Sequence, residues 1–340
     1  MIVTLATQNQ WIIHQLDVKS AFLNGFLEEE IYIEQPQEFV ASGGDKSMLL
    51  DFKNKMKKVF EMSDLGNMNY FLRMEVMQTE KGIFLSQRSF AVKVLDKFSM
   101  KNCKPTSTPM AVGMKLSRQE SGEPVCETIY KSLIGSLLYF TATRLDIMFS
   151  VSVLSRFMNC CNDQHFQTAK RVLRYIKGTI GHGVLFKRVE NMKLTGYVDS
   201  DWAGSCDDMR STSGYAFSLG SGMFCWSSKK QSLMAQSTAE AKFIAAATAN
   251  PVFHGRTKHF NIKLHVIREM EQAHEIELVH CNSEEQITEI FTKALNMSSD
   301  EDSTSNFESD EDYLSNYVVF TTNVTIGSDD GDTKIEYEGD

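Results

Sequence analysis

Acidic side chains close a β-prone run in this chain, where carboxylates could hold divalent metal ions. Asp199 and Asp201 end the run GYVDSD (196–201). In a regular strand, residues two positions apart point to the same face, so these carboxylates would lie side by side. Carboxylates grouped in this way hold the ions of two-metal sites. The spacing alone places Asp199 and Asp201 on one face of a strand and leaves the role of each open.

Glu240 stands near the predicted start of a helix, where its carboxylate has two possible roles. The pattern Ser237-x-x-Glu240 fits a capping box, in which the Glu side chain accepts a hydrogen bond from a free backbone N–H. From this spacing alone, the cap is the favoured interpretation. A metal-binding role for Glu240 rests on the sequence around it.

Basic residues follow one face of a predicted amphipathic helix. Lys170, Arg174 and Lys177 are spaced at i, i+4 and i+7, so they share a face. Such a stripe could follow a phosphate backbone, although a solvated helix face is the commoner meaning of this spacing. Arg256 and Lys258, in the basic stretch RTKH, could also contact phosphate.

Zinc and disulfide chemistry are not indicated. His254, His259 and His265 show neither the i, i+4 pair of an HExxH helix nor a cysteine at finger spacing. The seven cysteines form no CxxC pair, and their odd number argues against a complete disulfide framework. We expect reduced thiols in an intracellular protein.

The acidic charge is concentrated at the C-terminal end. The net charge is -9, but residues 298–340 contain 13 Asp or Glu and one Lys, a net of -12. The other 297 residues therefore carry +3, which permits nucleic-acid binding without proving it. The composition predicts a mostly disordered tail, and its one β-prone island, YVVFTTNVTI (317–326), is assigned no role.

The hydrophobic pattern predicts helices in the middle of the chain and strands on both sides. Helices are expected over 52–62, 89–100, 130–158 and 163–177, from Ser237 or Thr238 onward, and over 284–295. Strands are expected over 11–18 and 31–33, in hairpins turning near Lys81-Gly82 and at Gly220-Ser221-Gly222, and over 276–281. No apolar run approaches the ~20 residues that span a bilayer, and the N-terminus lacks the features of a secretory signal.

Several strings, in this order, resemble the Ty1/copia family of retrotransposon Pol polyproteins. The reverse transcriptase of that family is similar to QLDVKSAFLNGFLEEEIYIEQP (15–36) and FEMSDLGNMNYFLRMEV (60–76). Its connecting region is similar to YKSLIGSLLYFTATRLDIMFSVSVLSRFM (130–158) and AKRVLRYIKGT (169–179). Its RNase H is similar to residues 196–245, to HGRTKHFNIKLHVIRE (254–269) and to EEQITEIFTKAL (284–295). The resemblance covers about residues 11 to 295.

The resemblance implies an incomplete polymerase site. It assigns one metal-binding carboxylate to Asp17, whereas the family's second pair comes from a Tyr-x-Asp-Asp hairpin that this sequence lacks. The chain passes from EQPQEFVASGG straight to DKSMLLDFKNKM, so we expect an internal deletion near 40–46. Because one carboxylate cannot clamp two metal ions, we expect no polymerase activity.

The RNase H part of the resemblance implies three of four acids. It assigns the first to Asp199 in preference to Asp201, the second to Glu240, and the fourth to Glu289, where the family has Asp. The third acid lies on the next central strand in the family, and the join near 249–251 removes it. Loss of that strand would expose the faces of its neighbours. The implied cofactor is Mg²⁺ or Mn²⁺, held by the three remaining acids if any ion is retained.

The expected organisation is α/β (α+β), with a partial reverse-transcriptase palm and connection followed by an incomplete RNase H-like fold. The expected parts are a partial reverse transcriptase (1–125), a helical connection (126–190), an RNase H-like domain (191–297) and an acidic tail (298–340).

Three interpretations of function follow from the resemblance. The first is a catalytically defective enzyme fragment. The second is a non-catalytic module that binds RNA–DNA hybrid, single-stranded RNA or DNA, or proteins of an intact element. The third is a pseudogene product that does not fold stably. The resemblance implies a place in the cytoplasm, within virus-like particles, or in the nucleus, with neither secretion nor a membrane partner.

Overall fold

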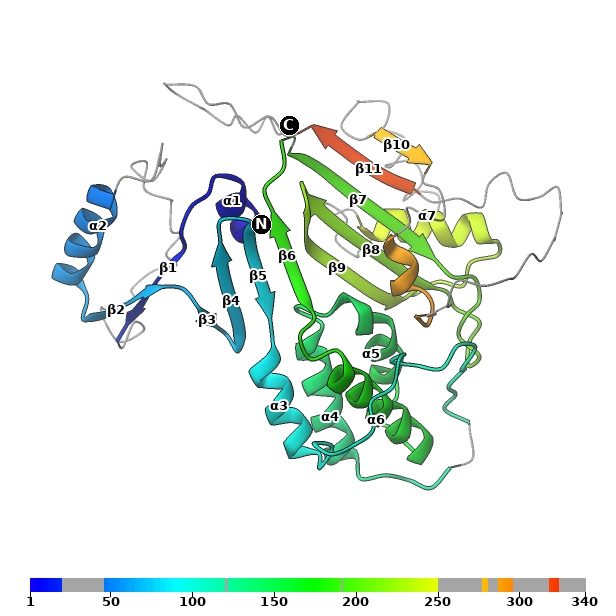
Figure 1. Ribbon diagram of the computed structural model, residues 1–340. Helices are drawn as coiled ribbons and strands as arrows, with labels where there is room; N and C mark the ends of the chain where they lie inside the picture. Colours follow the sequence, from blue (N-terminus) through cyan, green and yellow to red (C-terminus); the bar gives the residue numbers. More distant parts are fainter. Residues whose placement is uncertain are drawn as a thin grey trace, which may run out of the picture.

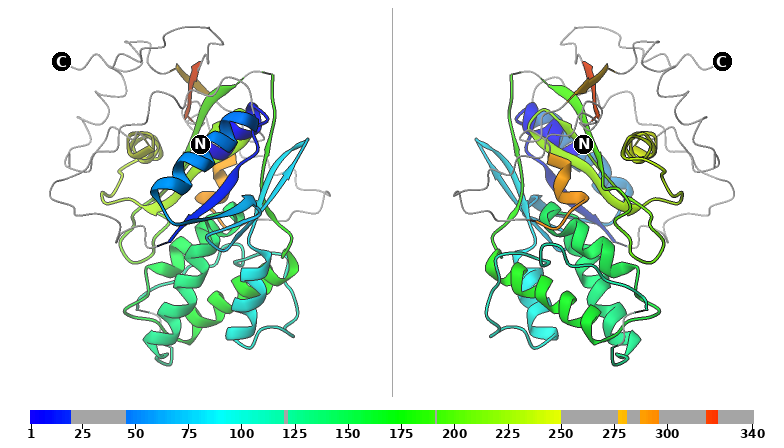
Figure 2. Two further views of the ribbon diagram at one scale, coloured as in Figure 1. Left: turned by 90° about the vertical axis from the view of Figure 1, so that its left-hand side faces the viewer. Right: turned by 90° about the vertical axis from the view of Figure 1, so that its right-hand side faces the viewer.

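The computed structural model describes residues 1–19, 46–119, 122–190, 192–249, 277–280, 287–295 and 318–323. Over these residues the protein is a mixed α/β structure of three antiparallel sheets and a layer of helices (Figure 1). The helices of the middle third of the chain gather at one end of the sheets (Figure 2). The strand predicted at 31–33, the three histidines of the basic stretch, Arg256 and Lys258 lie outside the described residues.

The N-terminal part forms two helices and a two-stranded sheet. Its elements are α1 (Ile2–Gln8), β1 (His14–Val18), α2 (Lys46–Val59) and β2 (Met62–Asn67). β1 and β2 pair antiparallel, with Asp17 opposite Ser63. The helix predicted over 52–62 is confirmed as α2, which begins and ends earlier.

A four-stranded sheet follows, and its last strand comes from about a hundred residues further along the chain. Its strands are β3 (Tyr70–Phe71), β4 (Met74–Thr79), β5 (Gly82–Ser86) and β6 (Gly183–Lys187), in that order. The hairpin predicted near Lys81-Gly82 is confirmed by the pairing of β4 with β5. Gly82 has φ of 140°, and a Cβ there would lie 2.0 Å from the carbonyl oxygen of Phe186. Only glycine therefore allows β6 to approach this turn.

The helical layer holds the largest apolar core. Its elements are α3 (Arg88–Lys97), α4 (Glu127–Phe140), the 3₁₀ helix η2 (Leu145–Ile147), α5 (Met148–Ser155) and α6 (Asp163–Gly178). The fully buried side chains of this core include Tyr130, Leu133, Ile134, Leu137, Leu154, Leu173 and Ile176. Phe90 and Val94 of α3 belong to the same core. One core therefore spans the predicted boundary at residue 125.

A five-stranded sheet forms the other half of the structure. Its order is β10 (Glu277–His280), β11 (Val318–Asn323), β7 (Lys193–Ser200), β8 (Thr212–Leu219) and β9 (Gly222–Lys230). The hairpin predicted at residues 220–222 is confirmed by the pairing of β8 with β9. Helix α7 (Thr238–Ala249) packs on this sheet, and its Ala245 and Ala246 belong to one apolar cluster with Val198, against which Tyr215 packs.

One sequence-based prediction for the C-terminal part needs correction. The helix predicted over 284–295 is a 3₁₀ helix, η4, confined to Ile287–Phe291 within the described residues. Strand β11 falls within the β-prone island predicted at 317–326, and the other residues of the tail lie outside the described residues. Among the described residues, no helix combines the length and apolar character needed to cross a bilayer.

Candidate functional site

Asp199 is the most deeply buried of the acids assigned to the two ancestral sites, which are Asp17, Asp199, Glu240 and Glu289. Only 3% of its surface is exposed. Its carboxylate accepts a hydrogen bond from Thr292 Oγ1 at 2.5 Å. Burial lowers the pKa of the nearby Lys242 ammonium, and the negative charge of Asp199 acts in the opposite direction. The Thr292 hydroxyl therefore supplies a hydrogen-bond donor to the Asp199 carboxylate, and the Lys242 ammonium is near enough to interact with its charge.

Gly214, directly opposite Asp199 on β8, makes room for η4. A Cβ at Gly214 would lie 2.6 Å from Phe291 Cβ and 3.1 Å from Thr292 Cγ2. Phe291 and Thr292 are both buried. The structure thus brings together the two segments that the resemblance assigned to the first and fourth acids. The contact is made through Thr292, however, rather than through Glu289.

Glu289 is engaged within its own segment. Its Oε1 lies 2.7 Å from Lys293 Nζ, and 45% of its side chain is exposed. Within the part of the chain that the structure describes, no group of three or more His, Cys, Asp or Glu side chains could hold a metal ion. The three predicted RNase H acids are therefore not gathered into a cluster.

Glu240 has the geometry of a helix cap. Its Oε2 accepts a hydrogen bond from the backbone N–H of Gln236 at 2.7 Å. Its own N–H donates to Ser237 Oγ at 3.1 Å. The bond to Ser237 Oγ is one of the two bonds of the predicted capping box. The other bond differs, because the Glu240 carboxylate accepts from the N–H of Gln236 and not from that of Ser237. The carboxylate of Glu240 thus stabilises the start of α7.

Replacement of Ser237 by Ala is expected to lower the free energy of unfolding by about 0.5–2 kcal/mol, because the N–H of Glu240 loses its acceptor. Thermal and urea unfolding measure this loss. Ser237→Asp is the matched control, since Asp also caps helices well, and it is expected to retain most of the stability. Equal losses in both variants would contradict the cap.

Asp17, the predicted polymerase remnant, lies exposed on β1. The neighbouring Lys19 pairs with Glu61 at 2.7 Å. The pKa of Lys19 is raised chiefly by Glu61, and the charge of Asp17 makes the smallest contribution. Asp17 thus has the surroundings of a solvent-facing acid on a strand.

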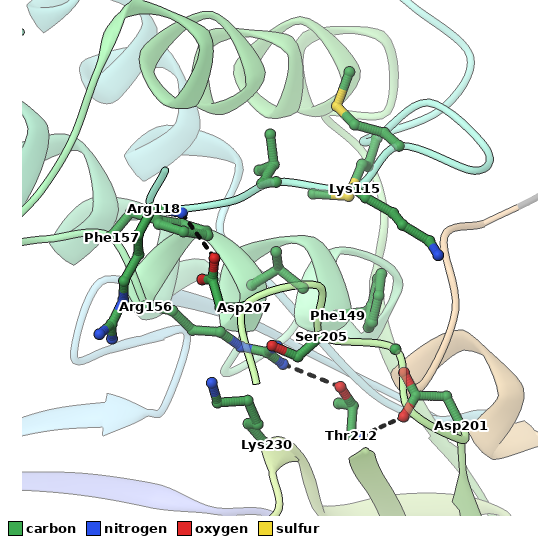
Figure 3. A pocket seen from close by; sticks show the side chains of 15 residues that line it. Lys115, Arg118, Phe149, Arg156, Phe157, Asp201, Ser205, Asp207, Thr212 and Lys230 are labelled. Carbon is green, nitrogen blue, oxygen red and sulfur yellow. Dashed lines mark hydrogen bonds between the residues drawn. The ribbon is translucent and has the colours of Figure 1, made fainter. Parts of the chain in front are cut away.

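Asp201 belongs to a second polar cluster, where α5 meets the loop between β7 and β8 (Figure 3). β7 ends at Ser200, so the alternation that would have paired Asp201 with Asp199 no longer applies. The carboxylate of Asp201 accepts a hydrogen bond from the backbone N–H of Thr212. Burial raises the pKa of Asp201 to about 6, despite the opposing effects of that bond and of Arg156.

Arg156 is a charged residue of this cluster that the sequence does not identify as a candidate. Its Nη2 donates to Thr212 Oγ1 at 3.1 Å. Burial lowers the pKa of the guanidinium, while Asp201, Asp208 and Asp207 raise it. Its charge within the apolar stretch 130–158 is the one signal in the sequence, and Lys131, Arg144 and Asp146 share that signal. The cluster joins the helical layer to the five-stranded sheet.

The basic stripe of α6 holds a neighbouring segment of the chain. Arg174 Nε donates to the carbonyl of Lys104 at 2.7 Å, and Lys177 Nζ donates to that of Cys103 at 2.5 Å. Lys170 lies over the ring of Phe166, with 4.5 Å between the ammonium and the ring centroid. These contacts compete with any use of the same groups for phosphate binding.

Replacement of Arg174 by Met is expected to loosen the segment after Cys103, since the carbonyl of Lys104 loses its donor. The expected cost is about 1 kcal/mol of stability, with faster amide exchange around 103–108. Lys101→Met, at an exposed position of the same region, is the control and is expected to change neither quantity. Unchanged exchange in Arg174→Met would contradict the contact.

Comparisons with known proteins decide the family. A family model described as reverse transcriptase (RNA-dependent DNA polymerase) matches residues 1–42 and, in a second segment, 37–112. The Pol polyprotein of transposon RE1 from Arabidopsis thaliana is 28% identical over 87% of this chain. That of transposon TNT 1-94 from Nicotiana tabacum is 29% identical over 86% of it. The chain belongs to the copia-type retrotransposon Pol family.

This Pol-family chain is much shorter than the polyproteins it matches. It covers 27% of the RE1 polyprotein and 30% of the TNT 1-94 polyprotein. It also resembles a mitochondrial protein of Arabidopsis thaliana, with 33% identity over 62% of this chain and 87% of that protein. No solved structure matches it.

The Pol-family match also contains gaps. The alignment with RE1 extends over 398 positions but involves 87% of 340 residues, which is about 296. About 100 aligned positions of the RE1 polyprotein therefore have no counterpart in this chain.

Proposed function

We propose that this Pol-family chain is a reverse-transcriptase and RNase H fragment that has lost both ancestral activities. Those activities are RNA-directed DNA synthesis and hydrolysis of RNA in RNA–DNA hybrids. One observation carries the proposal. Each remaining candidate acid of the RNase H part is bound by a neighbouring group of the protein, and the three do not converge.

The RNase H assignment is supported by the placement of Asp199 and Glu240. The first lies on β7 and the second in the first turn of α7, as the resemblance implies for the first two acids. A bound pair of Mg²⁺ or Mn²⁺ ions would activate water and stabilise the leaving oxygen in such a site. The described residues do not fit this requirement, because Asp199 faces Thr292 and Glu289 pairs with Lys293. We therefore assign no catalytic step to the remaining acids.

The polymerase part of the proposal rests on a missing block. The two segments of this chain that match the reverse-transcriptase family model overlap at residues 37–42. This position coincides with the deletion that the sequence predicts near 40–46. The Tyr-x-Asp-Asp string is absent from the whole sequence, so Asp17 has no partner pair. A single exposed carboxylate does not meet the needs of two-metal phosphoryl transfer.

Binding of RNA–DNA hybrid by the stripe on α6 is not favoured by the contacts. Arg174 and Lys177 already donate to backbone carbonyls, and releasing them for phosphate would leave those acceptors without their donors. We therefore keep the defective fragment as the proposed function.

Primer extension tests the polymerase half. The purified full chain is incubated with a primed RNA template, deoxynucleotides and Mg²⁺ or Mn²⁺, beside an intact reverse transcriptase as positive control. We expect no extension by the full chain. Extension that disappears in Asp17→Asn would overturn the proposal.

A further inference from the structure

The strand β11 occupies an internal position in the five-stranded sheet. It lies between β7 and β10, antiparallel to both (Figure 1). All six of its residues pair with β7, from Val318 opposite Val198 to Asn323 opposite Lys193. Four of them also pair with β10. The backbone of β11 therefore contributes hydrogen bonds on both sides.

The sequence predicts that this part of the chain has lost a central strand of its sheet. The expected deletion near 249–251 removes the central strand that would follow α7. Without β11, β7 would be an edge strand, with unpaired N–H and C=O groups along one side. β10 would then lose its link to the rest of the sheet, because among the described strands it pairs with β11 alone. Strand β11, which begins some seventy residues after the end of α7, thus covers this side of β7.

The composition of β11 suits an internal strand. Its residues, VVFTTN, are mostly β-branched or aromatic, and none is charged, although the 43-residue tail around it holds 13 acids. Because the strand contains no carboxylate, it restores the pairing of the sheet without restoring the third RNase H acid.

We propose that residues 318–323 replace the missing strand, so that the tail completes the sheet in cis. The side of β7 that faces away from β8 is then a surface that accepts an extended strand, and its occupant is this chain's own tail. This inference concerns the sheet alone and does not depend on whether the chain retains catalysis.

Hydrogen–deuterium exchange of the full chain tests the proposal through Val319→Pro. Proline has no N–H and is poorly accepted in an internal strand, so the pairing of β11 is expected to fail. Amides of residues 194–198 are expected to exchange about tenfold faster or more, while those of α6 keep their protection. Val319→Thr is the matched control, because it keeps both the branched Cβ and the N–H, and it is expected to retain protection.

A second control separates the strand from the rest of the tail. Ser303→Pro introduces the same residue outside 318–323 and is expected to leave exchange of β7 unchanged. Global unfolding of Val319→Pro, with both controls folded, would also support the proposal, because a detached tail has no such influence. Equal protection of β7 in Val319→Pro and Val319→Thr would overturn it.

Discussion

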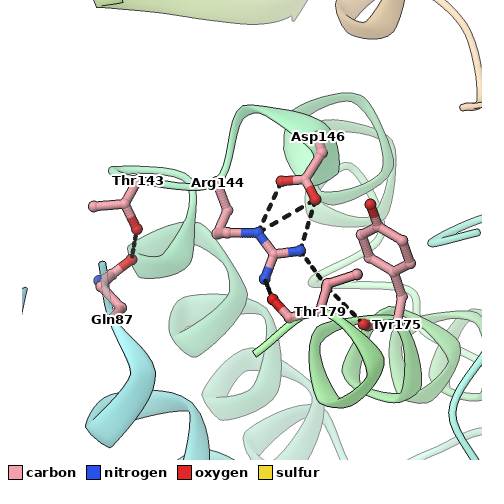
Figure 4. A network of polar contacts seen from close by, with 6 residues as sticks. All are labelled: Gln87, Thr143, Arg144, Asp146, Tyr175 and Thr179. Atoms are coloured by element: carbon pink, nitrogen blue, oxygen red, sulfur yellow. Dashed lines mark hydrogen bonds and ion pairs between the residues drawn. The ribbon is translucent and has the colours of Figure 1, made fainter. Parts of the chain in front are cut away.

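Replacement of Arg144 by Met is expected to lower the free energy of unfolding by about 3–5 kcal/mol, the cost of breaking a buried ion pair. Arg144 is 4% exposed and forms two-pronged contacts with Asp146, Nε to Oδ1 at 2.9 Å and Nη2 to Oδ2 at 2.6 Å (Figure 4). It also donates to the carbonyl oxygen and the hydroxyl of Thr179, at 3.1 and 2.6 Å. One guanidinium thus fastens the turn before α5 to the end of α6.

The loss is large because the Asp146 side chain, only 21% exposed, would remain without its cation. Burial acts to raise the pKa of Asp146, but the hydrogen bonds and charge of Arg144 outweigh it, so the pKa is lowered. This contribution is present above the ordinary pKa of an Asp and is lost as the pH falls through the lowered pKa. The difference between Arg144→Met and wild type is therefore expected to shrink below about pH 4.

Urea unfolding of Arg144→Met and Lys131→Met provides the comparison. Lys131 pairs with Glu127 at 2.7 Å, but both side chains are about half exposed, so its loss is expected to cost less than about 1 kcal/mol. The double variant Arg144→Met with Asp146→Leu is expected to recover much of the stability, since neither charge remains buried. Similar losses in Arg144→Met and Lys131→Met would contradict the role given to Arg144.

Replacement of Asp201 by Asn is expected to stabilise the protein, by about 3 kcal/mol near pH 8. The pKa of Asp201 is raised from 3.8 to about 6, chiefly by burial. Above that pH the folded protein must hold a buried carboxylate, which Asn avoids. The amide oxygen of Asn can still accept the hydrogen bond from the Thr212 N–H. Asp207 and Asp208 remain to balance the charge of Arg156.

The pH dependence has a defined sign. Because the folded pKa lies above the unfolded one, the contribution of Asp201 to stability is fully present below about pH 4 and is lost as the pH rises through about 6. The advantage of Asp201→Asn therefore grows between these values and is constant above them. Asp207→Asn, on the same loop but exposed, is the control and is expected to show no such growth. A stability difference that does not change with pH would contradict the buried state of Asp201.

Local spacing was enough to predict several features of the fold and site. The hairpins at Gly82 and at residues 220–222 and the start of α7 were found because glycine turns and a Ser cap act on their immediate neighbours. The site residues Asp199 and Glu240 were placed correctly on a strand and at a helix start, and the capping role of Glu240 was foreseen from its spacing.

Features that depend on distant partners were missed. Arg144 and Arg156 stand in an apolar stretch, and nothing nearby in the sequence reveals that Thr179 and Thr212 lie against them. For the same reason the stripe on α6 was interpreted as a candidate phosphate contact, although Lys104 and Cys103 supply its acceptors. The pairing of β11 with β7 does not follow from the sequence. The composition of the tail is an average over 43 residues, whereas the pairing depends on β7, more than a hundred residues earlier in the chain.

Cleavage of an RNA–DNA hybrid tests the central claim most directly. The full chain and Asp199→Asn are incubated with a labelled hybrid in Mg²⁺ or Mn²⁺, beside an intact RNase H, and the products are separated on a gel. Since Asp199 is bound by Thr292 and the other acids are engaged elsewhere, we predict no cleavage above that of Asp199→Asn. Metal-dependent cleavage by the full chain that is absent from Asp199→Asn would contradict the loss of activity.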